Sequence, residues 1–258
     1  MKKSIFIISV FLIAFSISVL AQTVSITPAG NSQIISPSPK CVVPQDGQVF
    51  SEDTILCSGT YYLPNGLKIH RGENMTFDCN GAKLVGPHNN YTHGVKGIES
   101  YVSENIVIKD CTITNYNIAL YLLWPKNNTV INNSLYDSYY GIYAALQSSN
   151  NYFLYNNLTN NSNGIRFEQT ENNTFAFNRV INNTRGLETD DVGGINITKN
   201  LFSGNNLGFN IVNTWKGPNN IWLNEVWDVS NVWDELNNNY CVNGRDNNYM
   251  GNSTGPHC

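Results

Sequence analysis

The chain has 258 residues, a formal net charge of -4 at pH 7 and only 13% charged residues. This length leaves room for one sizeable hydrophobic core. The charge excludes the basic field that attracts nucleic acid, so no nucleic-acid partner is expected. Asparagine is unusually abundant, with 42 residues spread mainly from the middle of the chain to its end. Because asparagine favours turns and 41% of the residues are hydrophobic, the composition predicts short apolar strands joined by tight corners rather than a disordered tract.

The first 21 residues are typical of a signal peptide. Two lysines precede an apolar stretch that runs from residue 5 to residue 20, and Ala21 ends a small-residue cleavage pattern. Cleavage there predicts a secreted, periplasmic or cell-surface protein, and an uncleaved anchor helix is the alternative. No later segment of the sequence is apolar for long enough to span a membrane, so no span is expected after signal cleavage. Residues 22–40 are rich in proline and serine and are expected to form a linker.

From residue 105 onward the sequence repeats with a period of about 22 residues. Segments aligned at Asn105, Asn127, Asn150, Asn172, Gly194 and Asn219 are separated by 22, 23, 22, 22 and 25 residues. Four apolar columns run down this alignment. The first contains Ile108, Val130, Phe153, Phe175, Ile197 and Trp222, and the second contains Ile113, Leu135, Leu158, Val180, Phe202 and Trp227. The third contains Leu120, Ile142, Ile165, Leu187 and Phe209, each after a glycine or alanine, and the fourth contains Leu122, Ala144, Phe167, Thr189 and Ile211.

The spacing of these columns predicts strands separated by corners. Side chains two residues apart share one face of a strand, but the first and second columns are five residues apart, which requires a corner between them. The alignment places Cys111, Asn133, Asn156, Asn178 and Asn200 at that corner. Stacked asparagines can satisfy one another's amides. The pattern therefore predicts an all-β, parallel β-helix (solenoid) with coils of about 22 residues over residues 41–236, followed by a C-terminal tail over 237–258.

The repeat motifs carry a family resemblance. They are NMTFDCNGAKLVG (74–86), NIVIKDCTITNYNIALYL (105–122) and NNTVINNSLYDSYYGIY (127–143). With these motifs the chain resembles the right-handed parallel β-helix proteins of the pectin-lyase-like superfamily, and it looks closest to their carbohydrate-binding and sugar-hydrolase branch (CASH, NosD-type). The resemblance implies a right-handed solenoid. It does not fix an activity, because lyases, hydrolases, epimerases and non-enzymatic surface proteins share these coils.

Six cysteines form an even set in a chain expected to meet an oxidising compartment. They allow 15 connectivities, among which the sequence alone does not choose. Because contacts in a solenoid are local in sequence, we expect sequential pairing as Cys41–Cys57, Cys79–Cys111 and Cys241–Cys258, the last of which would staple the tail. No Cys-x-x-Cys spacing occurs, and the four histidines are scattered, so neither a zinc nor a copper site is expected.

Outward positions of the strand that follows each glycine gather polar and aromatic residues. We call this set the outward strip, and it consists of Tyr121, Tyr143, Arg166, Glu168, Glu188, Asp190 and Asp191. Tyrosine rings stack on sugars, arginine binds carboxylates, and clustered carboxylates such as Glu168, Asp190 and Asp191 are candidate Ca²⁺ ligands. The alternative interpretation is a solvated sheet face whose arginine and glutamates pair across coils.

Two functions follow from the strip. The first is a secreted or cell-surface protein that binds a polysaccharide or cell-surface glycan, or serves as a surface interaction module. The alternative is a polysaccharide lyase or glycoside hydrolase acting on acidic polysaccharide, with Arg166 as base beside Glu188 and Asp190. Arginine is a poor base, and Thr189-Asp190-Asp191 matches a hydrolase motif only superficially, because no Gly-Asp-Asp, Gly-His-Gly or Arg-Ile-Lys sequence accompanies it. Beyond Trp227 the register is lost, so Trp222, Trp227 and Trp233 are expected to cover the open end of the stack.

Overall fold

The computed structural model describes residues 40–87, 94–212, 219–227, 231–234, 239–245 and 249–251. All of them belong to one compact unit, Pro39–Cys258. Within these residues the chain forms only strands, bridges and turns, so the all-β prediction is confirmed, and none of them form a helix that could cross a membrane. The expected signal peptide and, apart from Lys40, the expected linker lie outside the described residues.

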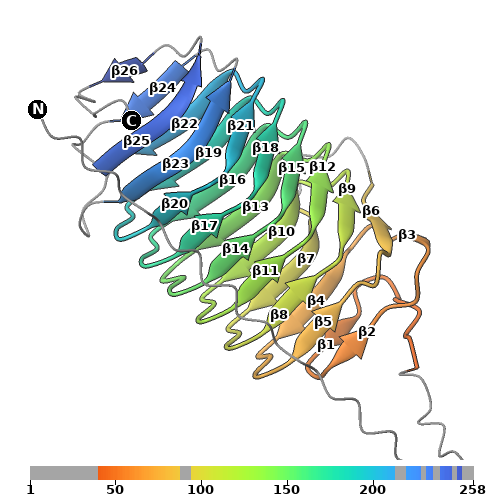
Figure 1. The fold of residues 1–258 in the computed structure, drawn as a ribbon. Coiled ribbons are helices and arrows are strands. Elements are labelled where there is room, and N and C mark those ends of the chain that lie inside the picture. Colours follow the sequence, from red (N-terminus) through yellow and green to blue (C-terminus); the bar gives the residue numbers. More distant parts are fainter. Residues whose placement is uncertain are drawn as a thin grey trace, which may run out of the picture. The chain divides into compact units, whose positions relative to one another are not determined.

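Successive turns of the chain stack as coils, and the paired strands run parallel (Figure 1). Most coils contribute one longer strand and two short ones. The longer strands form a ten-stranded sheet. Its members are β1 (Val49–Phe50), β4 (Leu67–His70), β7 (Lys96–Tyr101), β10 (Ile118–Leu123), β13 (Tyr140–Ala145), β16 (Asn163–Glu168), β19 (Arg185–Asp190), β22 (Leu207–Val212), β24 (Asn231–Asp234) and β26 (Tyr249–Gly251).

The short strands form the other two faces of the solenoid, which join into one sheet through β23 (Asn220–Trp227). The first series is β2 (Thr54–Ile55), β5 (Thr76–Asp78), β8 (Val107–Lys109), β11 (Thr129–Ile131), β14 (Tyr152–Leu154), β17 (Thr174–Ala176) and β20 (Asn196–Thr198), with β25 (Asn239–Arg245) on β23. The second series is β3 (Thr60–Tyr62), β6 (Lys83–Val85), β9 (Thr112–Thr114), β12 (Ser134–Tyr136), β15 (Asn157–Thr159), β18 (Arg179–Ile181) and β21 (Leu201–Ser203).

The four predicted columns form the interior. Every one of their members between residues 108 and 211 is buried, and the strand registers match the predicted alignment from β8 to β22. A fully buried leucine, isoleucine or phenylalanine stabilises the fold by about 1.5–3 kcal/mol. Repetition of such residues in every coil therefore explains how a narrow stack maintains a continuous core.

One coil departs from the predicted register. The first column continues with Ile221 rather than Trp222, and the second with Val226 rather than Trp227. The predicted interval of 25 residues is therefore wrong, and the observed interval is 24, from Ile197 to Ile221. Ile221, and not the larger Trp222, continues the inward column and is buried. Successive residues of a strand point to opposite faces, so only one of the two can point inward.

The strands also continue further than predicted. β25 pairs with β23, and β26 pairs with β24, so stacking extends to Gly251 instead of ending at residue 236. A register shift in the pairing of β22 with β24 brings Val232 opposite Phe209, which restores the third column beyond the predicted break. Trp222 and Trp227 lie on β23 and Trp233 lies on β24, and β25 and β26 stack beyond them. These three tryptophans were expected to cover the open end of the stack, but they do not belong to the final coil. The predicted Cys241–Cys258 bond falls outside the described residues.

Asparagine ladders hold the corners. In the predicted ladder each buried amide nitrogen donates to the side-chain oxygen of the next coil at 2.9–3.1 Å. This ladder extends one coil beyond the prediction, to Asn224. Two further ladders were not predicted. One contains Asn128, Asn151 and Asn173. The other contains Asn161, Asn183 and Asn205, and the backbone N–H of Ser138 donates to the side-chain oxygen of Asn161 at its start.

Two disulfides join neighbouring coils at the N-terminal end. Cys41 is bonded to Cys57, and Cys79 to Cys111, as sequential pairing requires. Cys111 occupies the ladder position of its coil, and its backbone N–H donates to Asn133 Oδ1 at 3.0 Å. The disulfide therefore continues the column in which later coils carry asparagine.

Candidate functional site

The outward strip lies on the ten-stranded sheet, across β10, β13, β16 and β19. The structure places its members in two adjacent columns with one residue per coil. The first column is Tyr121, Tyr143, Arg166 and Glu188, and the second ends with Glu168 and Asp190. The side chains project outward because they alternate with inward residues of the third and fourth apolar columns.

Arg166 lies at the centre of an ion cluster. Its Nη1 is 3.0 Å from Glu188 Oε1, and its Nη2 is 3.0 Å from Glu168 Oε2 and 3.4 Å from Asp190 Oδ2. The Nε–H donates to Glu168 Oε2 at 3.0 Å. Arg185 Nη1 lies 3.9 Å from Glu188 Oε2 at the edge of the cluster. The structure therefore shows the cross-coil pairing of the alternative interpretation.

This pairing fixes the protonation of Arg166. Burial alone would lower the pKa of the guanidinium, but Glu188 and Glu168 outweigh it and raise the pKa above its ordinary value. The side chain is only 18% exposed, so solvent screens these charges weakly. Arg166 consequently keeps its proton, which argues against the role of general base that a lyase would require.

Tyrosines form the other half of the strip. The rings of Tyr121 and Tyr143 have centroids 5.3 Å apart, and Tyr140, which the sequence analysis did not select, lies 5.0 Å from Tyr143. Lys96 Nζ is 5.1 Å from the centroid of Tyr121. The hydroxyl of Tyr143 donates to Glu168 Oε2. Burial and this hydrogen bond raise the pKa of Tyr143, so the phenol stays neutral well into the alkaline range.

Two buried polar groups on the sheet that carries the strip lack hydrogen-bond partners among the described residues. Asn163 is 1% exposed and stands in register between Tyr140 and Arg185. Neither its amide nitrogen nor its amide oxygen has a hydrogen-bond partner among the described residues, and the same holds for Glu188 Oε2. Buried polar atoms are nearly always paired, so these atoms are an exception, and their burial keeps them out of reach of a ligand on the surface.

The geometry of the strip does not favour calcium. The guanidinium of Arg166 lies against both Glu168 and Asp190, and a cation there would be repelled by it. In the described part of the chain, no group of three or more acidic, histidine or cysteine side chains is arranged to hold a metal ion. Asp191 is only partly exposed and follows β19 at a positive φ of 54°, outside the cluster around Arg166.

Two further coils extend the strip toward the N-terminus. Glu99 and Tyr101 on β7 pair with Tyr121 and Leu123, and Lys68 on β4 pairs with Glu99. These residues were not predicted from the sequence, because the aligned repeat begins at residue 105. The recurrence of a small residue, Gly97, before the buried Ile98 was the signal that could have identified this earlier coil.

A protein-family comparison agrees with this architecture. The model described as "right handed beta helix region" matches residues 74–227. Among solved structures, the pectate lyase Pel9A superposes with a TM-score of 0.57 at 16% identity, over 79% of this chain and 64% of that one. A DFA-IIIase from Arthrobacter chlorophenolicus A6 in complex with DFA-III gives 0.53 at 14% identity, over 72% and 49%.

The chain covers less than two thirds of either of these structures. At such low identity the likeness concerns the fold alone. A search among curated proteins found no match. The family match shows a right-handed β-helix, and nothing in these comparisons singles out the CASH or NosD-type branch.

Proposed function

We propose that this chain, which belongs to the right-handed β-helix family, is an exported protein that binds a glycan along its outward strip. The supporting observation is the row of Tyr121, Tyr143 and Tyr140 rings on the ten-stranded sheet. Aromatic faces stack on sugar rings. Two disulfides are consistent with a location outside the reducing cytosol.

The charges of the strip favour a neutral glycan over an acidic one. Arg166 is already paired with Glu168, Glu188 and Asp190, and Arg185 is the only other cation in that cluster of described residues. A uronate would have to displace one of these carboxylates and would then lie beside the other two. A ligand rich in hydroxyl groups faces no such repulsion.

The same observation weakens the lyase alternative. The fold is shared with a pectate lyase and a DFA-IIIase, but a lyase requires a group that can accept a proton. Arg166 has a raised pKa and stays a cation. Binding is therefore the function that this geometry supports best.

The proposal is tested on a glycan array with the full chain and two variants. We expect the wild type to retain neutral glycans, and Tyr121→Ala to weaken that retention by about tenfold or more. Tyr136→Ala is the matched control, because Tyr136 also contacts a lysine, Lys83 at 5.6 Å, but lies on β12 of a different face. Absence of binding by the wild type, or equal losses in both variants, would refute the proposal.

A further inference from the structure

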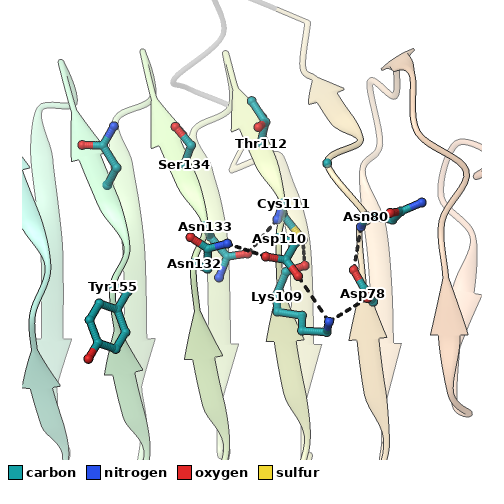
Figure 2. Close-up of a pocket in the computed structure, with 12 residues that line it drawn as sticks. Asp78, Asn80, Lys109, Asp110, Cys111, Thr112, Asn132, Asn133, Ser134 and Tyr155 are labelled. Atoms are coloured by element: carbon teal, nitrogen blue, oxygen red, sulfur yellow. Dashed lines mark hydrogen bonds and ion pairs between the residues drawn. The ribbon is translucent and has the colours of Figure 1, made fainter.

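A hollow of about 670 Å³ lies over the corner between the two series of short strands, away from the ten-stranded sheet. Figure 2 shows its polar side chains crossing four coils, from Asp78 on β5 to Tyr155 after β14. Neighbouring coils are about 4.8 Å apart, so the hollow is about 14 Å long. Residues that line it include Asp78, Asn80, Lys109, Asp110, Asn132 and Tyr155.

Chain length at the corner explains why a hollow forms there. Four residues connect Asp78 to Lys83, whereas two connect Lys109 to Thr112 in the paired coil. The longer corner places Asn80 and Gly81 at one end of the hollow. Tyr155 lies at the other end, and the buried Cys79–Cys111 disulfide ties together the two coils beneath. The shape is therefore fixed before any ligand binds.

The floor of the hollow is polar and is not cationic. Lys109 Nζ lies 2.7 Å from Asp78 Oδ2 and 3.2 Å from Asp110 Oδ2, and the amide of Asn132 donates to Asp110 Oδ1. The hydrogen bonds to Asp78 and Asp110 raise the pKa of Lys109, which therefore stays charged. With two carboxylates for one ammonium, the floor does not attract an anion.

Exposed aromatic rings stand at the end of this floor. Tyr155 and Phe177 stack with centroids 5.0 Å apart and an interplanar angle of 11°, and Lys199 Nζ lies 5.2 Å from the Phe177 centroid. Tyr155 is 55% exposed and Phe177 41%, so burial does not account for them.

The backbone makes these two residues more unusual. Tyr155 has φ 54° and Phe177 has φ 58°, in the left-handed region where bulky residues are disfavoured. Asn132 fills the same position one coil earlier with φ 56°, as this conformation prefers. Asp110 and Lys199 have the same conformation in their own coils, so the corner imposes it. The exposed aromatic rings at a position where asparagine suits the fold better are therefore the feature that a ligand would explain.

We infer that this hollow is a second carbohydrate site, separate from the outward strip, and that it takes a neutral oligosaccharide. The chain of sugars lies across the coils. One ring stacks on Tyr155, and the hydroxyl groups of the next rings bind the amides and carboxylates of Asn132, Asp110 and Asn80. This inference stands independently of the strip, because none of the strip residues line the hollow.

Isothermal titration of the full chain with cello-, manno-, xylo- and laminari-oligosaccharides tests the inference, with oligogalacturonate as the acidic probe. We expect at least one neutral probe to bind, and Tyr155→Asn to weaken that binding by about tenfold or more. The variant copies the neighbouring coil, so it should fold. Tyr152→Asn is the matched control, because Tyr152 is 48% exposed on β14 but does not line the hollow.

The outcomes separate the two sites. Loss of neutral-probe binding in Tyr155→Asn but not in Tyr152→Asn supports the hollow, whatever Tyr121→Ala does. Three results overturn it: no neutral probe binds the wild type, oligogalacturonate binds more tightly than every neutral probe, or Tyr155→Asn binds as the wild type does. In the third case, a loss confined to Tyr121→Ala would leave the strip as the binding site.

Discussion

Each asparagine of a ladder serves several partners at once. Asn178 accepts the backbone N–H and the side-chain amide of Asn156 and donates to Phe153 O and Asn200 Oδ1. All of these groups are buried, so a gap in the ladder would leave donors and acceptors unsatisfied. The residue that precedes the ladder position is commonly in the left-handed region, for example Asn132 at φ 56°. These two demands explain the asparagine content.

Replacement of Asn178 with alanine should therefore lower the free energy of unfolding by about 3 kcal/mol or more, since an unsatisfied buried group costs about 1–3 kcal/mol. Asn206→Ala, at an exposed asparagine, should change stability by no more than about 0.5 kcal/mol. Urea titration of both variants measures the difference. Equal midpoints would show that the ladder hydrogen bonds contribute little.

Arg166 should prove structural as well as functional. Its removal leaves Glu168, Glu188 and Asp190 adjacent without their counter-ion, so Arg166→Ala should destabilise the protein by about 2 kcal/mol or more. Arg185, whose side chain is 43% exposed and 3.9 Å from Glu188, is the control, with an expected loss under about 1 kcal/mol. Thermal melts that give the same loss for both arginines would contradict the cluster.

The tyrosines predict how stability depends on alkaline pH. Burial raises the pKa of Tyr121, Tyr140 and Tyr143 in the folded protein, with the Glu168 hydrogen bond adding to the shift at Tyr143. In the unfolded chain these phenols ionise near pH 10. Their contribution is therefore complete below about pH 10 and is lost as the pH rises toward their folded pKa values. The free energy of unfolding should fall less steeply above about pH 10 in Tyr143→Phe than in the wild type, and an unchanged slope would contradict the assignment.

At the scale of strands, the glycine before four of the five third-column residues allows close packing of coils, and Ala119 takes this place before Leu120. A Cβ built on Gly141, Gly164 or Gly186 lies 2.6 Å from the carbonyl oxygen of the next coil, and none of the three has a positive φ. Backbone oxygens of a paired strand cannot move aside easily. The glycines thus reflect contact distance and not backbone conformation.

Gly164→Val should accordingly destabilise the protein by about 2–3 kcal/mol through overpacking against Gly186 O and Val180. Thr184→Val, at an exposed residue of the following coil, should be nearly neutral. Differential scanning calorimetry distinguishes them. If Gly164→Val melted at the wild-type temperature, the neighbouring coil would be able to move away from the valine with no loss in the free energy of unfolding, and the close-packing explanation would be wrong.

The sequence predicted the strands well where its period was regular. From residue 105 to residue 211 the offset of five and the inward parity determine the register, because one slip would expose a whole column. Prediction failed at Ile221, because Ile221 and Trp222 are adjacent and both apolar. The alternation of polar and apolar residues therefore did not show which of the two points inward. The corner ladders through Asn151 and Asn161 were missed because serine replaces asparagine in their first coils, at Ser103 and Ser138.

At the scale of the molecule, a solenoid places residues of distant sequence in straight rows. The outward strip could be predicted because it follows directly from the inward columns of the same strands. The ion pairs within the strip could not be predicted. The alignment shows which residues share a column, but it does not show which outward side chains contact one another. The hollow beside Tyr155 could not be predicted either, since it depends on two extra residues in the corner at Asn80, which shift the coil but leave the repeat unchanged.

The most direct test of glycan binding by the strip is a crystal structure of the full chain with the neutral oligosaccharide that it retains on the array. We expect sugar density over β10, β13 and β16, with a ring stacked on Tyr121 or Tyr140. Density that avoids this face while the strip keeps its internal ion pairs would contradict the proposal.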